Sequence, residues 1–342
     1  MKNRQRIIYI SGLNKKRRKY DGERIKNTLI FKSLIKKYDV TLINLSALKI
    51  LRTIKIFIYA LFGKKKYDYV VISKDPHGAN IIHRVLKFVK YPFDKVIYFE
   101  IGPFLFDRIN NGSIKIETFI NDRLIVVETP SMKRELESLG FQNIDVFPNF
   151  KPVVNIDFVT KKYPIDTLNL VFLSRIEEPK GLYDLIDVLS IVNKQNIKYR
   201  LDVYGRIQSN EDKQRLENYL KKYPFVQYKG KMDVGSVESY RKLSEYDLHV
   251  FPTKYTEGFP GSIIDFFIAG VPTLASSFAR AHEILSSDDS IIFEQFNNND
   301  LLNKLEYIYN NQDILFSLRE NSYKKRNMYS TESFEEYLDK II

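Results

Sequence analysis

Short apolar runs rich in β-branched residues alternate with stretches of helical period along almost the whole chain. The runs lie near residues 6–11, 39–45, 69–73, 95–100, 123–128 and 144–147, and again near 168–174, 200–204, 226–229, 247–251, 272–275 and 290–293. This alternation is typical of parallel α/β layers joined by helical crossovers. The two series have similar lengths, so the sequence predicts an α/β protein with two Rossmann-like domains.

The segment 146–167 separates the two series, and it contains three prolines and no clear period. We therefore expect an N-terminal domain at 1–150, a linker at 151–167 and a C-terminal domain at 168–329. The last stretch, 330–342, places Phe334, Leu338 and Ile341 on one face of a helix. We expect this terminal helix to return to the N-terminal domain. A length of 342 residues is compatible with two hydrophobic cores.

The composition argues against several classes of protein. The chain has no cysteine and only four histidines, which lack metal-ligand spacing. It also lacks an Asp-x-Asp motif, so we expect no metal and no cofactor. The start, 1–12, has no apolar signal-peptide stretch, and the most apolar window, 53–63, is too short to span a bilayer. These features predict a cytoplasmic protein.

A loop with two cations follows the strand-like run at 168–174. In "RIEEPKG" (175–181), Arg175 and Lys180 bracket the start of an expected helix. Cations are disfavoured at a helix N-terminus unless an anion binds there. A bound diphosphate would satisfy both the cations and the helix. Alternatively, Glu177 and Glu178 neutralise the two cations on a solvated turn.

A second loop, "PTKYTEGFPG" (252–261), follows the run at 247–251. Gly258 and Gly261 allow the backbone to approach a ligand closely. The carboxylate of Glu257 can accept hydrogen bonds from sugar hydroxyls, and Asp265 can reach the ribose of the same ligand. The alternative for Asp265 is a capping box with Ser262.

Together, the motifs of these two loops resemble those of a known protein family. "SRIEEPKG", followed about eighty residues later by "EGFPGSIIDFFIAGVP", resembles the paired signature of family 4 glycosyltransferases. The similarity continues in "YG" (204–205), "YKGKM" (228–232), "YDLHVFPT" (246–253) and "VFPN" (146–149). The resemblance implies a retaining enzyme that uses a nucleotide sugar and has the GT-B fold, in which two Rossmann-like domains face each other across a cleft.

The resemblance also implies roles for individual residues. Glu257 would be the catalytic residue at the donor sugar, and Asp265 would bind the ribose, although the family has a longer glutamate there. The residues expected at the donor diphosphate are Arg175, Lys180, Gly258, Phe259 and Gly22. The acceptor hydroxyl would attack from the face of the leaving group, with a diphosphate oxygen taking its proton.

The amino-terminal half resembles the family less. The family often has a histidine near the fourth strand, where this chain has Glu100. His77 and Asp75 lie one strand earlier. Each of the three is a possible contact for acceptor or sugar, and each is equally compatible with an ordinary polar residue at a strand end.

A net charge of +12 favours an anionic partner. The segment 47–66 predicts a helix with a wide apolar face that includes Ile54, Ile58 and Leu61, and three lysines follow at 64–66. Together with the basic loop 14–26, this helix suits an anionic membrane surface. The alternative is a Rossmann helix packed on its sheet. The aromatic residues do not lie among the lysines, so nucleic acid is disfavoured.

The sequence thus predicts a metal-independent, retaining glycosyltransferase. Its acceptor would be a lipid-linked or growing saccharide in capsular, exo- or lipopolysaccharide synthesis, at the inner face of the plasma membrane. Two alternatives stay open at this point. One is a nucleotide-sugar epimerase of GT-B fold, and the other is a non-catalytic basic protein that binds anionic lipid or nucleic acid.

Overall fold

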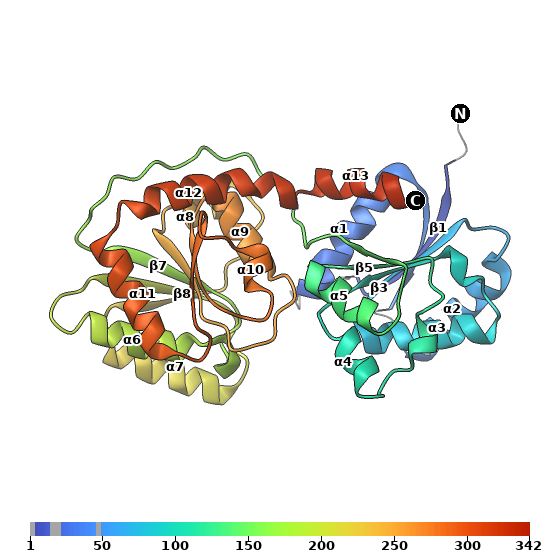
Figure 1. Cartoon of the computed structure of the whole chain (residues 1–342), viewed down its shortest axis with the longest axis horizontal. Coiled ribbons are helices and arrows are strands. Elements are labelled where there is room, and N and C mark those ends of the chain that lie inside the picture. Colours follow the sequence, from blue (N-terminus) through green and yellow to red (C-terminus); the bar gives the residue numbers. More distant parts are fainter. Residues whose placement is uncertain (1–3, 14–21, 46–48) are drawn as a thin grey trace. The chain divides into compact units, whose positions relative to one another are not determined.

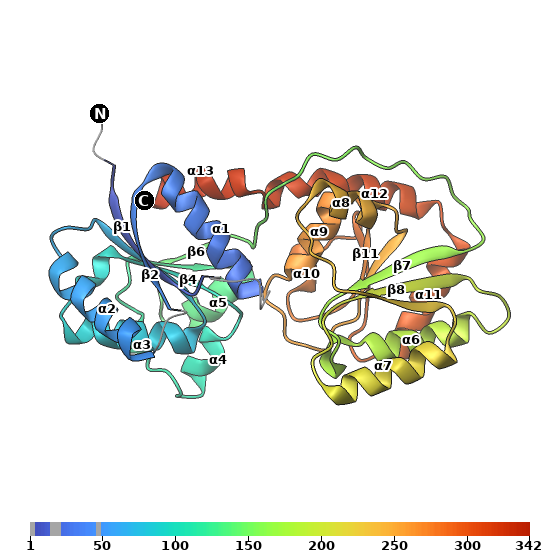
Figure 2. The same cartoon turned by 180° about the vertical axis from the view of Figure 1, so that it is seen from behind.

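The computed structural model describes residues 4–13, 22–45 and 49–342 of the chain. It divides into two compact units (Figures 1 and 2). Unit 1 consists of Met1–Lys151 together with Thr331–Ile342, and unit 2 consists of Pro152–Ser330. The segment predicted as a linker contains no helix or longer strand. Residues 152–167 nevertheless pack as part of unit 2, where Ile156 is buried and Lys161 pairs with Asp247 at 2.7 Å.

Unit 1 is built on a six-stranded parallel sheet with the order β2-β1-β3-β4-β5-β6. Its elements are β1 (Arg6–Ser11), α1 (Gly22–Lys37), β2 (Asp39–Asn44), α2 (Lys49–Gly63), β3 (Tyr69–Lys74), α3 (Pro76–Phe88), η1 (Phe93–Lys95), β4 (Val96–Glu100), α4 (Leu105–Asn110), η2 (Ile116–Thr118), β5 (Leu124–Val127), α5 (Pro130–Ser138), β6 (Ile144–Val146) and α13 (Thr331–Ile341). Side chains of α2, α3 and α5 fill one face of this sheet, and those of α1 and α13 fill the other.

Unit 2 contains a second six-stranded parallel sheet, with the order β12-β11-β10-β7-β8-β9. Its elements are β7 (Leu168–Leu173), η3 (Glu178–Lys180), α6 (Leu182–Val192), β8 (Tyr199–Tyr204), α7 (Asn210–Lys222), β9 (Val226–Gly230), α8 (Val237–Ser244), β10 (Leu248–Phe251), α9 (Gly261–Ala269), β11 (Thr273–Ser276), α10 (Ala281–Ile284), β12 (Ser290–Phe293), α11 (Asn298–Asn310), α12 (Ile314–Lys325) and η4 (Arg326–Tyr329). This is the doubly wound strand order of Rossmann folds.

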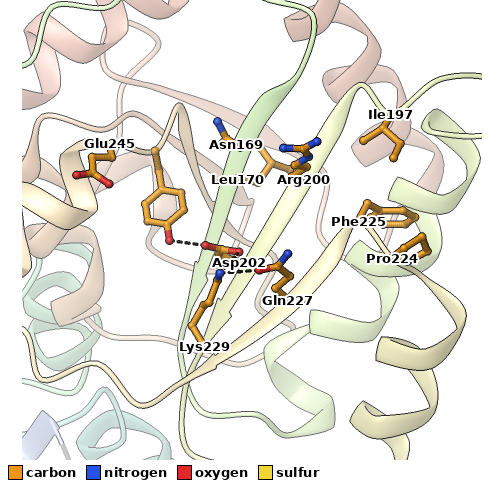
Figure 3. A pocket seen from close by; sticks show the side chains of 11 residues that line it. Asn169, Leu170, Ile197, Arg200, Asp202, Pro224, Phe225, Gln227, Lys229 and Glu245 are labelled. Carbon is orange, nitrogen blue, oxygen red and sulfur yellow. Dashed lines mark hydrogen bonds and ion pairs between the residues drawn. The ribbon is translucent and has the colours of Figure 1, made fainter.

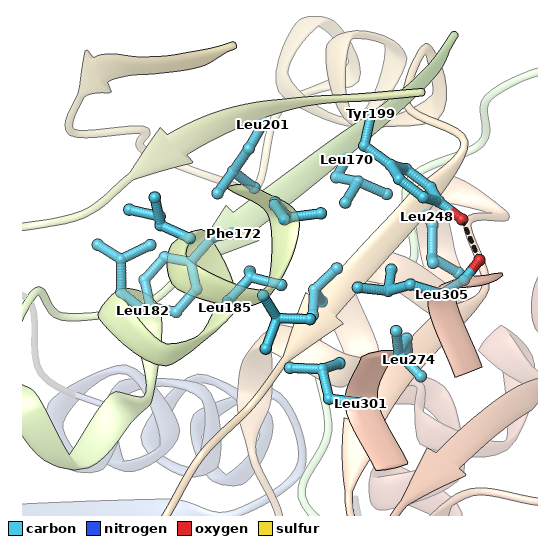
Figure 4. Close-up of a cluster of buried hydrophobic side chains, with 14 of the residues drawn as sticks. Leu170, Phe172, Leu182, Leu185, Tyr199, Leu201, Leu248, Leu274, Leu301 and Leu305 are labelled. Carbon is cyan, nitrogen blue, oxygen red and sulfur yellow. Dashed lines mark hydrogen bonds between the residues drawn. The ribbon is translucent and has the colours of Figure 1, made fainter. Parts of the chain in front are cut away.

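Successive residues along the strands of unit 2 point to opposite faces of its sheet, and apolar side chains pack against helices on both faces. Leu170 and Phe172 of β7 point toward α6 and α11, whereas Val171 between them packs on the α8–α9 side. Figure 4 shows the first cluster, in which the Tyr199 hydroxyl donates to the Leu305 carbonyl at 2.6 Å. Leucines dominate that cluster, so the core of unit 2 forms around the strands that carry the predicted loops.

All twelve predicted strands are present within one or two residues of their predicted bounds. The sheets confirm the predicted α/β class with two Rossmann-like domains. No helix that the structure describes is both long and apolar enough to cross a bilayer.

Candidate functional site

The two loops singled out in the sequence follow neighbouring strands of unit 2. β7 and β10 lie side by side at the centre of the sheet, and the strand order reverses between them. In open α/β sheets, ligands bind beyond the carboxyl ends of the strands at this kind of switch point. The loops 174–181 and 252–260 therefore occupy the position in unit 2 where a ligand is expected.

Glycine allows these loops to approach each other closely. Gly181 has a φ of +72°, and a Cβ added there would lie 1.9 Å from the Pro252 carbonyl oxygen. The Lys254 N–H donates to the Pro179 carbonyl at 2.8 Å, which joins the two loops at the backbone level. Any larger residue at 181 would push the loops apart.

Lys180 and Glu257 meet across the two loops. The Lys180 Nζ lies 2.6 Å from Glu257 Oε1, and both side chains are largely shielded from solvent. Thr253 donates its hydroxyl to the same oxygen at 3.0 Å, and the Lys180 ammonium lies 5.1 Å from the centre of the Tyr255 ring. Glu257 Oε2 has no hydrogen-bond partner among the described residues. The structure therefore brings the predicted diphosphate and sugar residues together.

Arg175 has a different environment. Its side chain is 54% exposed, and its Nη2 lies 3.0 Å from Glu177 Oε1. The alternative in which acidic neighbours neutralise the cations therefore holds for Arg175, which pairs with Glu177. It does not hold for Lys180, which is buried and pairs with Glu257. Glu178 pairs with neither of the two predicted cations.

A second ionic cluster reinforces the loops, and sequence reasoning missed it. The Lys254 Nζ lies 2.6 Å from Asp184 Oδ2 and 3.0 Å from Glu178 Oε1, and Arg215 also pairs with Glu178. Partial burial opposes the charge on Lys254, but the two carboxylates outweigh it and raise its pKa. Lys254 lies within the quoted loop, yet its partners lie about seventy residues earlier in the chain, and no local pattern connects them.

Asp265 is buried on α9 and is 4% exposed. Its Oδ1 accepts a hydrogen bond from the Tyr240 hydroxyl at 3.0 Å, and burial together with this carboxylate raises the Tyr240 pKa. The capping box with Ser262 is absent, because α9 begins at Gly261 and Pro260 occupies the N-cap position. Asp265 thus has an interaction with α8 that the sequence did not indicate.

Gly258 and Phe259 form the end of the second loop. Both are buried, and the Phe259 ring packs 5.0 Å from the ring of Tyr329. Phe259 therefore anchors the loop to the core of unit 2, and only its backbone can contribute to an anion site.

In unit 1, the predicted residues lie at the carboxyl edge of the sheet. Asp75 caps α3 by accepting the Gly78 N–H at 3.1 Å, and it lies 2.6 Å from the Lys74 ammonium. Burial raises the Asp75 pKa, but Lys74 and the Gly78 N–H outweigh it and lower the pKa overall. Lys74 also pairs with Glu23, next to the exposed Gly22 at the start of α1.

His77 and Glu100 differ sharply in exposure. His77 is exposed in the first turn of α3, whereas Glu100 is 2% exposed at the end of β4. Glu100 Oε1 accepts the N–H groups of Phe104 and Leu105 at 3.1 and 2.8 Å. Glu100 therefore organises the start of α4, a role that sequence reasoning did not consider.

A hollow of about 630 Å³ lies elsewhere on unit 2 (Figure 3). Its polar lining comes from the faces of β8 and β9 and includes Arg200, Asp202, Gln227 and Lys229. Lys229 donates to Gln227 at 2.6 Å, and Tyr246 donates to Asp202 at 2.7 Å. None of the predicted donor residues lines it. Among the described residues, no group of three or more His, Asp or Glu side chains is arranged to hold a metal ion.

Residues 156–325 match the family model described as glycosyl transferases group 1. Through this segment the chain belongs to the glycosyl transferases of group 1. The matched segment contains both loops of the Lys180–Glu257 pair. No curated protein matches the sequence.

Solved glycosyltransferases share the fold of this group 1 chain. HepE of Anabaena, solved with UDP, is 12% identical with a TM-score of 0.73, and the match covers 98% of this chain and 99% of HepE. Sucrose-phosphate synthase of Thermosynechococcus elongatus is 14% identical with a TM-score of 0.70, covering 99% and 98%. The lipopolysaccharide outer core galactosyltransferase WaaB is 14% identical with a TM-score of 0.68, covering 98% and 100%. The predicted glycosyltransferase family and GT-B fold are confirmed.

Proposed function

We propose that this glycosyltransferase is a retaining enzyme whose unit 2 binds a nucleotide-sugar donor through the loops after β7 and β10. The Lys180–Glu257 pair carries this proposal, because it sets a shielded cation beside a carboxylate at the switch point of the sheet. Unit 1 would bind the acceptor, a lipid-linked or growing saccharide of a surface polysaccharide. The enzyme would act in the cytoplasm, at the inner face of the plasma membrane.

The two side chains have complementary roles in this proposal. An ammonium group has three donors, so Lys180 can hold Glu257 with one and donate to diphosphate oxygens with the others. Arg175, which is exposed, can turn from Glu177 to the same phosphates. Glu257 Oε2 can accept from a sugar hydroxyl. Asp265 would accept from the ribose only by sharing its carboxylate with Tyr240.

In this proposal, catalysis rests on stabilising the negative charge that develops on the leaving group. As the bond to the sugar breaks, negative charge grows on the departing diphosphate, and Lys180, Arg175 and the backbone N–H groups before α9 would stabilise it. The acceptor hydroxyl attacks from the same face and passes its proton to a diphosphate oxygen. Neither a protein base nor a metal ion has a step in this scheme. At the acceptor, Asp75 and His77 are the proposed contacts, and Glu100 would act through the start of α4.

The test is a thermal-shift screen with UDP-, GDP-, dTDP- and CMP-sugars. UDP-glucose is the first donor to try, because HepE was solved with it. A donor at 100 times its Kd stabilises the folded state by about 2.7 kcal/mol. We expect one donor class to stabilise the protein equally with and without EDTA, Lys180→Ala to abolish that shift, and Glu257→Ala to weaken it.

Lys213→Ala is the matched control, because Lys213 is an exposed lysine of unit 2 with only a distant partner, Glu217, at 3.9 Å. It should leave the shift unchanged. Equal shifts in Lys180→Ala and wild type would remove the diphosphate assignment. The absence of any shift with every donor would favour a non-catalytic binding protein.

A further inference from the structure

Two adjacent helices of unit 1 expose large apolar side chains. Phe62 of α2 is 75% exposed and Phe88 of α3 is 78% exposed. The helices lie side by side (Figures 1 and 2), and the rings of Phe57 and Phe88 approach to 6.1 Å. The α2–α3 patch comprises Ile54, Ile58, Leu61, Phe62, Ile81 and Phe88, each at least 40% exposed. Contiguous apolar surface of this kind marks an interaction site on a folded protein.

Packing within unit 1 does not account for the patch. α2 meets its sheet through Ile56, Ala60 and Gly63, all of them buried. The apolar face predicted from the sequence, with Ile54, Ile58 and Leu61, is exposed instead. α2 therefore has a second apolar face that unit 1 does not cover.

The surroundings of the patch are basic. The exposed or half-exposed cations beside it are Lys55, Lys64, Lys65, Lys66, Arg84, Lys87 and Lys90. Neither α2 nor α3 contains an aspartate or a glutamate. Asp75, which precedes α3, is engaged by Lys74 and by the N-terminus of that helix. The α2–α3 patch thus combines apolar side chains with a rim in which cations outnumber the exposed acids Asp68 and Asp94.

We infer that the α2–α3 patch docks on the surface of an anionic phospholipid bilayer. Apolar side chains entering the interface and lysines beside acidic headgroups stabilise this kind of contact together. A second copy of the chain fits less well, because a symmetric contact would bring the two basic rims against each other. Arg84 lines a hollow of about 340 Å³ with Phe57 and Phe88, where it can contact a lipid phosphate. The inference concerns unit 1 alone and does not depend on the proposed transfer reaction.

The experiment uses the full chain with vesicles of phosphatidylcholine, alone or with about 30% phosphatidylglycerol. Co-sedimentation gives the partition coefficient of wild type, Phe62→Ser/Phe88→Ser and Lys65→Gln/Lys87→Gln. All four side chains are exposed, so the variants should keep the wild-type unfolding temperature. Matched controls in unit 2 are Ile191→Ser, at a 58% exposed position of α6, and Lys213→Gln.

We expect wild type to bind the anionic vesicles at least tenfold better than pure phosphatidylcholine. Each lost lysine should lower the partition coefficient about fivefold, so Lys65→Gln/Lys87→Gln loses about 25-fold. Phe62→Ser/Phe88→Ser should lose at least tenfold, and the two controls should match wild type.

Three results would overturn the inference. The first is a wild-type protein that does not bind anionic vesicles, and the second is an apolar variant that binds them as well as wild type does. The third is a dimer, detected by sedimentation velocity, that Phe62→Ser/Phe88→Ser converts to monomer, because the patch would then join two copies of the chain. Donor-induced thermal shifts, measured on the same samples, report separately on unit 2.

Discussion

At the scale of single residues, the Lys180–Glu257 pair links folding to ligand binding. Lys180 is largely buried beside its ion-pair partner Glu257, and Glu257 also accepts a hydrogen bond from the Thr253 hydroxyl. A charge held in this way is costly to leave unpaired. The same carboxylate is the proposed sugar contact, so its substitution should affect stability and donor binding together.

Glu257→Gln tests this coupling, because glutamine keeps the shape of the side chain and removes its charge. We expect a loss of about 1–3 kcal/mol in the free energy of unfolding, since the Lys180 charge loses its counterion. The transfer rate should fall about 100-fold or more. Urea unfolding followed by circular dichroism, together with a transfer assay, measures both quantities.

Thr253→Val is the comparison variant. It removes the hydrogen bond to Glu257 and the one that the Tyr255 N–H donates to Thr253 Oγ1, but it leaves the ion pair. It should therefore cost about 1–2 kcal/mol in the free energy of unfolding and lower the transfer rate much less than Glu257→Gln does. If Glu257→Gln proved as stable as wild type, Lys180 would not depend on that carboxylate. If it transferred sugar at the wild-type rate, Glu257 would have no part in catalysis.

At the scale of elements, Lys254 fixes the second loop against the first. It contacts Glu178 of η3, Asp184 of α6 and, through its backbone, Pro179. Arg215 of α7 holds Glu178 from the other side, with its guanidinium 3.9 Å from the centre of the Tyr183 ring. These contacts set the distance between the loops before any ligand arrives, so we regard Lys254 as a positioning residue.

Lys254→Met should therefore raise the KM for the donor about tenfold and leave kcat within about threefold. Without Lys254 the two loops are not held in place before the donor binds, so part of the binding free energy is used to order them. Its effect on the unfolding free energy should stay below about 1 kcal/mol, because the side chain is partly solvated. Steady-state kinetics at several donor concentrations separates KM from kcat. Lys229→Met, which breaks the ion pair with Asp202 at the hollow of Figure 3, is the control. A fall in kcat with no change in KM would contradict a positioning role.

The elements themselves were largely predictable from the sequence. Strands such as Leu168–Leu173 and Leu248–Phe251 carry continuous apolar runs, and the residues after each parallel strand share one edge of the sheet. That rule alone placed Lys180 and Glu257 near each other. The identity of side-chain partners was not predictable, because Tyr240 meets Asp265 and Glu178 meets Lys254 only after the helices have packed. The buried face of α2 was not predictable either, because the apolar pattern of this helix does not reveal which of its faces the sheet covers.

At the scale of the whole molecule, the chain ends in the unit where it began. α13 places Phe334 and Leu338 fully inside the core of unit 1, where Phe334 stacks on Phe150 at a centroid distance of 4.1 Å. Lys36 pairs with Glu335 at 2.5 Å, and Tyr337 donates to Asp145 at 3.0 Å. The final helix is therefore part of the fold of unit 1, although 179 residues of unit 2 precede it in the sequence (Pro152–Ser330).

This arrangement predicts a selective effect for Phe334→Ala. Removing the ring leaves a cavity among Phe99, Phe147 and Phe150, and such truncations cost about 3–5 kcal/mol. The core clusters of unit 2 contain no residue of α13. Hydrogen exchange measured by mass spectrometry should therefore show faster exchange in β1, β3 and β4, with β7, β8 and β10 unchanged.

Phe316→Ala, at a 45% exposed position of α12, is the matched control and should change exchange little in either unit. A variant of Phe334 that exchanges faster in both sheets to the same extent would show that the two units unfold as one. Unchanged exchange throughout would show that α13 adds little to the stability of unit 1. Loss of protection confined to unit 1 would establish that α13 completes the core on one face of the N-terminal sheet, so that unit 1 can finish folding only after the whole of unit 2 has been synthesised.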